Sequence, residues 1–246
     1  MFASFVPALS FRTAASRRLP RAFLQAAESS SAAAGLGRRS GGSGALRLLT
    51  STSLRMADLK EEVDPGKVEG TDLQIVKYPH PSLRAENALV SEDELAALAP
   101  LAKEMFLLMY AAQGVGLAAP QVGVNQRLMV YNPSGDSTKW LDEVVLVNPR
   151  IVDRSEATDV ETEGCLSFPD MSGDVERHKW IKVEALNLKG RKIKKKYQGW
   201  EARIFQHEYD HLDGVVYIDR LTEEGRASVQ PRLDELVDEF GEGGKL

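Results

Sequence analysis

Gln206-His207-Glu208-Tyr209-Asp210-His211-Leu212, near the C-terminal end of the chain, is the stretch from which we predict the fold and the chemistry. On an α-helix, residues four apart lie on the same face, so His207 and His211 would present two imidazoles to one point. Two imidazoles placed in this way can bind one divalent metal, and Glu208 stands beside the first, where it can handle protons. The chain has only four histidines in 246 residues, so this spacing favours a metal site over a coincidence.

The third protein ligand decides the class of chemistry, because a catalytic metal site usually has three protein ligands and one open position. A metzincin would have its third histidine at position 217, where this chain has Tyr217. A thermolysin-like zinc peptidase would use a downstream glutamate, for which Glu223, Glu224 and Glu235 are available. The remaining candidate is Cys165, the single cysteine, and a single cysteine excludes an intramolecular disulfide. A metal-stabilised module without catalysis is a further alternative.

Three blocks of sequence, in this order, resemble the three signature motifs of peptide deformylases: GVGLAAPQVG at 114–123, EGCLSFP at 163–169 and QHEYDHLDG at 206–214. The resemblance extends from about Leu73 to Leu221 and looks most like the bacterial-type enzyme that eukaryotes carry in plastids or mitochondria. It implies metal-dependent hydrolysis that releases formate from the N-terminal N-formylmethionine of nascent, organelle-encoded polypeptides.

The resemblance also implies a metal centre of Cys165, His207 and His211. One thiolate and two neutral imidazoles leave a divalent ion with a net positive charge, and such an ion can lower the pKa of bound water to about 7. Family members are commonly Fe²⁺ enzymes that tolerate Zn²⁺, Ni²⁺ or Co²⁺, and this ligand set does not discriminate among them. Glu208 is then the general base and acid.

The family implies roles for further residues around the metal. The side chain of Gln121 and the backbone N–H of Leu166 are the expected donors to the oxyanion. The substrate peptide is expected to lie in extended form along the segment that holds Gly114 and Gly116. Its methionine side chain is expected in an apolar slot lined by Val115, Trp200, Ile204 and His207. Trp200 is larger than the leucine expected in many bacterial members, which puts the shape of the slot in question.

For two further groups of polar residues, the sequence gives weaker evidence of a functional role. Glu163 and Arg177 match a family salt bridge behind the metal site, and Asp210 is expected to give structural support. Lys192, Lys194, Lys195 and Lys196 form a basic run, for which a solvated strand face is the simpler interpretation. Contact with ribosomal RNA is the alternative.

The order of elements predicts an α+β fold, since strands and helices do not alternate strictly. Ser91 and Glu94 look like a capping box that opens a helix ending before Gly114, with Pro100 either kinking the helix or marking its first turn. Residues 73–76 read as a short strand-like run. We expect further strands at 127–132, 144–148, 181–188, 192–197 and 215–218, and helices at 201–212 and 231–240. The resemblance implies antiparallel sheets packed around the central metal-binding helix, with an N-terminal helix and a C-terminal helix.

The N-terminal 56 residues differ in composition from the rest of the chain. They carry eight arginines and one acidic residue, Glu28, whereas the remainder carries 23 basic and 35 acidic residues. A basic, serine-rich, acid-poor start predicts an organellar transit peptide at 1–56, with a retained disordered tail as the alternative. A linker at 57–71 and a catalytic domain at 72–246 would follow. We expect the plastid stroma as the location, with the mitochondrion as the alternative.

A net charge of −5 argues against DNA as a partner, and the lack of an apolar run of about 20 residues argues against a membrane span.

Overall fold

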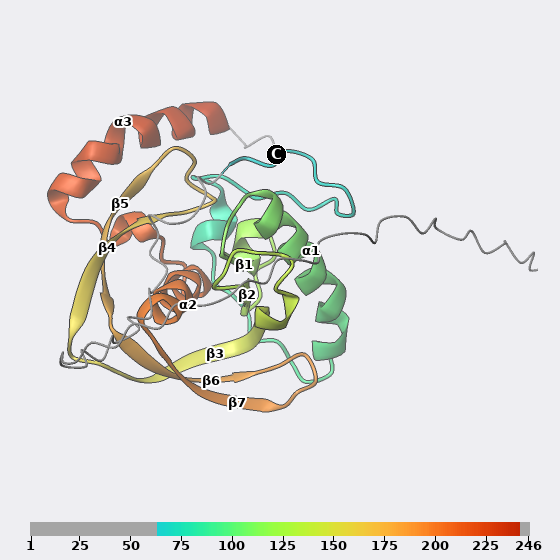
Figure 1. Cartoon of the computed structure of the whole chain (residues 1–246). Coiled ribbons are helices and arrows are strands. Elements are labelled where there is room, and N and C mark those ends of the chain that lie inside the picture. The colour runs from blue at the N-terminus through green and yellow to red at the C-terminus, as the bar shows by residue number, and fades with distance from the viewer. Residues whose placement is uncertain (1–62, 242–246) are drawn as a thin grey trace, which may run out of the picture. The chain divides into compact units, whose positions relative to one another are not determined.

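The computed structural model describes residues 63–241 (Figure 1). The transit peptide predicted at 1–56 and the first part of the linker predicted at 57–71 lie outside these residues. The described part has the predicted α+β architecture of antiparallel sheets and three α-helices. Among the described residues, no helix has the length and apolar composition that crossing a membrane requires.

The larger sheet has five antiparallel strands in the order β1-β2-β3-β6-β7. Their bounds are Gly116–Ala118, Leu128–Tyr131, Val144–Arg154, Trp180–Leu186 and Lys192–Gln198. The pairing of β3 with β6 is irregular between Val147 and Arg150, where Asn148 has a positive φ of 49°. The Asn148 side chain bonds to both backbone groups of Val90, which fixes the incoming chain against this bulge.

A second sheet has two strands, β4 (Thr158–Gly164) and β5 (Ser172–His178). Their antiparallel register pairs Gly164 with Ser172, so the segment between the strands returns beside the end of β4. Cys165 is the first residue of that segment and therefore starts from a fixed position.

Helix α2 (Gly199–Leu212) lies at the centre of the described domain, with strands of both sheets around it (Figure 1). One side of the helix buries Ala202, Phe205 and Leu212 against inward-facing residues of the larger sheet, such as Tyr197. Its other side carries buried polar groups, which is unusual unless each has a partner. This helix was predicted at 201–212, and its central place is confirmed.

The two other helices close the domain on separate sides. Helix α1 (Leu98–Ala111) buries Met105, Leu108 and Met109 against residues of β1 and β2, as its three- and four-residue spacing predicts. Helix α3 (Glu223–Phe240) packs Leu233 and Leu236 into a separate core cluster that includes Cys165.

Several boundaries differ from the sequence-based expectations. Ser91 donates to the Glu94 carboxylate from both its amide and its hydroxyl, which is half of the expected capping box. A 3₁₀ turn (Leu95–Ala97) follows, and the α-helix begins only at Leu98, with Pro100 in its first turn. The strand predicted at 215–218 is wrong, because Tyr217–Asp219 forms a 3₁₀ turn there. The C-terminal helix begins eight residues earlier than predicted, where the hydroxyl of Thr222 accepts a hydrogen bond from the Gly225 amide at 3.1 Å.

Candidate metal centre and active site

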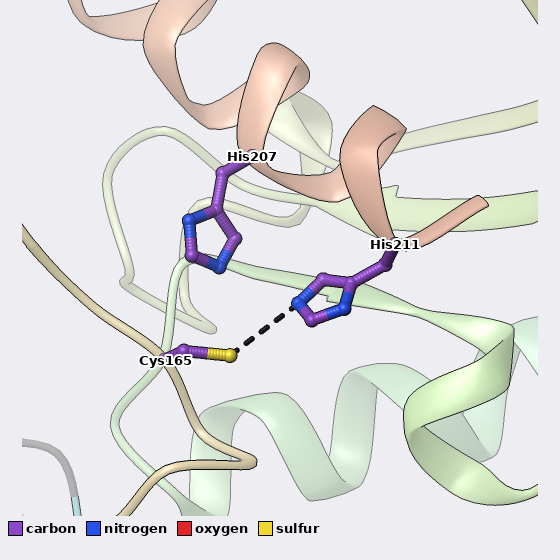
Figure 2. A group of neighbouring side chains, drawn as sticks. All are labelled: Cys165, His207 and His211. Atoms are coloured by element: carbon purple, nitrogen blue, oxygen red, sulfur yellow. Dashed lines mark hydrogen bonds between the residues drawn. The ribbon is translucent and has the colours of Figure 1, made fainter. Parts of the chain in front are cut away.

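Cys165, His207 and His211 converge on one point (Figure 2). One ligand atom from each lies within 4.8 Å of the other two, and the Sγ atom of Cys165 is 3.3 Å from Nε2 of His211. Both histidines project from α2, whereas Cys165 lies on the segment after β4 (Figure 2). Cys165 and His211 are buried, and the side chain of His207 is 12% exposed. The predicted ligand set is therefore assembled in space.

Glu163 fixes the orientation of the first imidazole. Nδ1 of His207 lies 2.9 Å from Oε2 of Glu163 and donates a proton to it, so Nε2 is the ring nitrogen that is left for Cys165, His211 or a metal. Arg177 donates to both oxygens of the same carboxylate at 3.0 and 2.9 Å, so the predicted salt bridge is confirmed. Burial alone would raise the pKa of Glu163, but His207 and Arg177 hold it well below its usual range. The carboxylate therefore stays ionised.

A second arginine, Arg203, also pairs with Glu163, and its role was not predicted from the sequence. Its Nη1 atom donates to Glu163 at 2.7 Å, and its Nη2 atom donates to Asp159 at 2.7 Å, with only 4% of the side chain exposed. Arg203 lies four residues before His207 on α2, and this spacing is a signal from which the shared face could have been found. Arg177 also contacts Asp210, which pairs with Arg220 at 2.6 Å, in line with a supporting role for that carboxylate.

The electrostatics of the three candidate ligands fit a divalent cation. Burial lowers the pKa of His211, and the nearby charges of His207 and Arg177 lower it further, so this imidazole is neutral and able to ligate. Burial also acts to lower the pKa of His207, but Cys165 and Glu163 raise it well above its ordinary value. The groups around His207 thus favour a positive charge between thiolate and carboxylate, and a thiolate with two imidazoles suits a divalent ion.

Gln121 points its amide group at the metal centre. Its Oε1 atom accepts a hydrogen bond from the Ala118 amide at 2.8 Å, and this bond orients the opposite Nε2 atom. Nε2 lies 3.3 Å from Oγ of Ser167 and 3.6 Å from Sγ of Cys165. Gln121 and Ser167 are both buried, so the amide donor is held before any ligand arrives.

Glu208 lies against the backbone of β1. A Cβ atom added to Gly116 would lie 2.3 Å from Oε1 of Glu208, so only glycine leaves room for this carboxylate. A Cβ added to Gly114 would instead lie 2.8 Å from the side chain of Leu166. The two glycines of the first motif therefore admit two different side chains.

A pocket opens beside these groups, and the empty space in and above it, open solvent included, is about 400 Å³. Most of the predicted site residues line it: Val115, Gly116, Gln121, Cys165, Leu166, Trp200, Ile204, His207 and Glu208. Gly114 and His211 are outside this lining, and Glu163 and Arg203, from behind the metal centre, reach it. The indole of Trp200 is fixed as a wall because its Nε1 atom donates to the carbonyl of Pro133 at 2.9 Å.

A family model described as polypeptide deformylase matches residues 72–227. The chain belongs to this family. Peptide deformylase 1B, chloroplastic, of Oryza sativa subsp. japonica is 44% identical over 176 residues, covering 71% of this chain and 64% of the relative. Peptide deformylase 1B, chloroplastic/mitochondrial, of Arabidopsis thaliana is 43% identical over 173 residues, covering 70% and 62%. This chain therefore spans less than two thirds of the length of these plant relatives.

Solved deformylase structures have the same fold. A crystal structure of a plant peptide deformylase is 42% identical, with a TM-score of 0.66, and the match covers 70% of this chain and 92% of that chain. A peptide deformylase from Plasmodium falciparum is 37% identical, with a TM-score of 0.65, and the match covers 70% and 100%. The deformylase fold predicted from the three motifs is therefore confirmed, and its Cys-His-His site is the one typical of deformylases.

Proposed function

We propose that this protein is a peptide deformylase that hydrolyses the formyl group of N-terminal N-formylmethionine and releases formate. The observation that carries the proposal is the convergence of Cys165, His207 and His211 on one point, beside a pocket that Glu208 and Gln121 line. A zinc peptidase with a downstream glutamate ligand has less support. Its candidates Glu223, Glu224 and Glu235 all lie on α3, whereas the three ligands converge without them.

The substrate would bind as an extra strand. β1 is an end strand of the five-stranded sheet, so an extended formyl peptide can pair with the edge that β2 leaves open. The side chain of its methionine would enter the slot formed by Val115, Ile204 and Trp200, which line the pocket together. The formyl carbon would then lie near Glu208 and Gln121.

Cys165, His207 and His211 would hold a divalent ion, which supplies Lewis acidity toward water and the formyl oxygen. Glu208 accepts a proton from the attacking water, whose oxygen forms a bond to the formyl carbon. Nε2 of Gln121 and the N–H of Leu166 donate to the oxyanion that develops. The carbon–nitrogen bond then breaks, formate leaves, and Glu208 returns the proton to the methionine amine.

We propose Fe²⁺ as the native ion, with Zn²⁺, Ni²⁺ or Co²⁺ as alternatives. The buried thiolate and imidazoles suit all four ions, since borderline-soft ligands of this kind select weakly among them. The metal content of protein purified without oxygen, measured together with the activity restored by each ion after chelation, tests this assignment.

The substrates we propose are nascent polypeptides made within the plastid, or within the mitochondrion as the alternative. The basic, acid-poor composition of residues 1–56 supports import, and the plant relatives are named for these organelles. Import of residues 1–56 fused to a fluorescent reporter would test the location.

Contact with the organellar ribosome has weaker support. The four lysines of the basic run lie on the edge strand β7, but Lys194 pairs with Glu184 at 2.8 Å and Lys195 with Glu201 at 3.1 Å, so part of the charge is neutralised. Ribosome association that survives replacement of all four lysines by glutamine would remove this idea.

The decisive experiment measures formate release from a formyl-Met peptide by the Fe²⁺-loaded protein. We expect turnover by the wild-type chain, and loss of both metal and turnover in Cys165→Ser. A zinc peptidase with a glutamate ligand would keep its metal and its own activity in that variant. No formate release from a folded, metal-loaded wild type would reject the proposed activity.

A further inference from the structure

The backbone around Val76 takes a different form from the short strand-like run expected at 73–76. No strand is formed by these residues, which lie in the described part of the chain. The main-chain N–H of Val76 donates to the carbonyl of Gln121 at 2.8 Å, and the N–H of Tyr78 donates to the carbonyl of Ser167 at 2.9 Å. The segment therefore joins the loop of the first motif to the loop of the second.

Lys77 stands between these two bonds. Its Nζ atom donates to the carbonyl of Leu166 at 3.0 Å, and the side chain is 25% exposed. Leu166 is the residue whose N–H is the expected backbone donor to the oxyanion. A charged ammonium makes a stronger hydrogen bond to a carbonyl than a neutral donor does.

Three consecutive carbonyls of the second-motif loop are fixed by these contacts. The carbonyl of Cys165 accepts from the Phe168 amide at 2.8 Å, which closes a turn. The carbonyls of Leu166 and Ser167 are held by Lys77 and Tyr78. The Leu166 N–H shares a rigid peptide plane with the carbonyl of Cys165, so the bond from Phe168 sets its direction. The bonds to the carbonyls of Leu166 and Ser167 restrict rotation within the turn and so keep Phe168 in place to make that bond.

The second contact of Lys77 does not explain its position. Nζ lies 3.7 Å from Asp64, whose side chain is 63% exposed, and exposed ion pairs of this kind contribute little. The bond to the carbonyl of Leu166 is shorter and better shielded from water, so it is the contact that determines where the ammonium lies.

We propose that Lys77 is a positioning residue of the oxyanion hole, holding the turn from Cys165 to Phe168 so that the Leu166 N–H faces the reacting carbonyl. The inference rests on the proposed deformylation. It predicts that removing the ammonium affects the reaction of bound substrate more than substrate binding, because the misplaced donor acts on the charge that develops in the transition state.

The test compares the metal-loaded 246-residue chain with Lys77→Met, which keeps the stem, and Lys77→Arg, which keeps a charged donor. Lys67→Met is the matched control, because Lys67 lines the same surface hollow as Lys77. We expect kcat on a formyl-Met peptide to fall by about 10-fold in Lys77→Met with KM within about 2-fold, and Lys77→Arg to recover most of kcat. Lys67→Met should match the wild type.

Hydrogen exchange of the amides of residues 165–168 gives a readout that does not depend on turnover. We expect faster exchange in Lys77→Met, with metal content unchanged. Unchanged exchange with unchanged kcat would overturn the proposal, as would faster exchange with an unaltered kcat. If the wild type released no formate while exchange still increased in Lys77→Met, the deformylation proposal would fail but the hold on the turn would stand.

Discussion

Oε2 of Glu163 accepts a hydrogen bond from Nδ1 of His207 at 2.9 Å, from a carboxylate position that is 1% exposed. The same carboxylate accepts from Arg177 and Arg203, so one buried anion balances two cations and orients a candidate metal ligand. A buried carboxylate with this many donors stabilises the folded state only while it is ionised.

The first prediction concerns the pH dependence of stability. Replacing Glu163 with glutamine should lower the free energy of unfolding by about 3–5 kcal/mol at pH 7, because two buried guanidinium groups lose the buried carboxylate that they share. The folded-state pKa of Glu163 lies below its ordinary value of 4.5. Its contribution is therefore complete above about pH 4.5 and is lost as the pH falls toward the folded-state pKa.

Urea unfolding of metal-free wild type and Glu163→Gln checks this prediction. The difference between the two proteins should be largest at pH 7 and smaller at pH 3.5. Glu161→Gln is the matched control, since Glu161 lies 3.4 Å from Arg203 but is 36% exposed, and its effect should be small. A difference that is the same at both pH values would show that the charge on Glu163 is not what stabilises the fold.

Arg203 gives the second prediction. Arg203→Met should weaken metal binding by about 10–100-fold, as loss of a group that orients a ligand commonly does. Arg203→Lys should recover part of the affinity, because it keeps a charge but not the fork that reaches both Glu163 and Asp159. Competition with a chromogenic chelator measures the affinity.

The control for Arg203 is Arg232→Met on α3. Arg232 forms ion pairs with Glu235 and Glu239, both more than 60% exposed, and its loss should leave metal affinity unchanged. If Arg203→Met bound the metal with wild-type affinity, the Arg203 guanidinium would contribute to packing and not to metal binding.

Helix α2, which carries His207 and His211, and the buried face of α1 could be predicted because apolar side chains recur at helical spacing in both. Strands β4 and β5 could not. Val175 and Arg177 alternate on the buried side of β5, and Glu163 is buried on β4, so two of these three inward positions carry charge. A search for alternating apolar residues does not find a strand whose inner face is an ion-pair network.

The opposite error occurred at residues 215–218. Val216, Tyr217 and Ile218 are all buried, which produces the apolar run that predicted a strand. The run lies between two helices and packs in a 3₁₀ turn, with the Val216 amide bonded to Asp219 at 3.0 Å. A short buried run does not by itself distinguish a strand from a turn. The two candidate histidine ligands, in contrast, could be paired from residue type and helical spacing, whereas Cys165 was selected by the resemblance to the deformylase motifs.

The third prediction follows from the close approach of Gly116 to Glu208. Gly116→Ala should displace the carboxylate and lower kcat by about 10²-fold or more, while the metal is retained. The double variant Gly116→Ala, Glu208→Gln should be little slower than Glu208→Gln alone, because both changes remove the same function. If the effects of the two substitutions on kcat were fully additive, Gly116→Ala would act on something other than Glu208, for example on the pairing of β1 with the substrate.

The last prediction concerns Trp200 and the choice of side chain. Trp200→Leu should enlarge the slot and reduce the preference for formyl-Met over formyl-Phe peptides, measured as the ratio of kcat/KM values, by ~10-fold, because added volume removes both contacts to methionine and the clash with phenylalanine. Trp200→Phe separates size from anchoring, since it keeps an aromatic wall but loses the bond from Nε1 to Pro133. Trp140→Leu is the matched control, because Trp140 is 65% exposed and is not among the residues that line the pocket. If Trp200→Phe relaxed the preference as much as Trp200→Leu, the hydrogen bond from Nε1 to Pro133, and not the volume of the side chain, would set the selectivity.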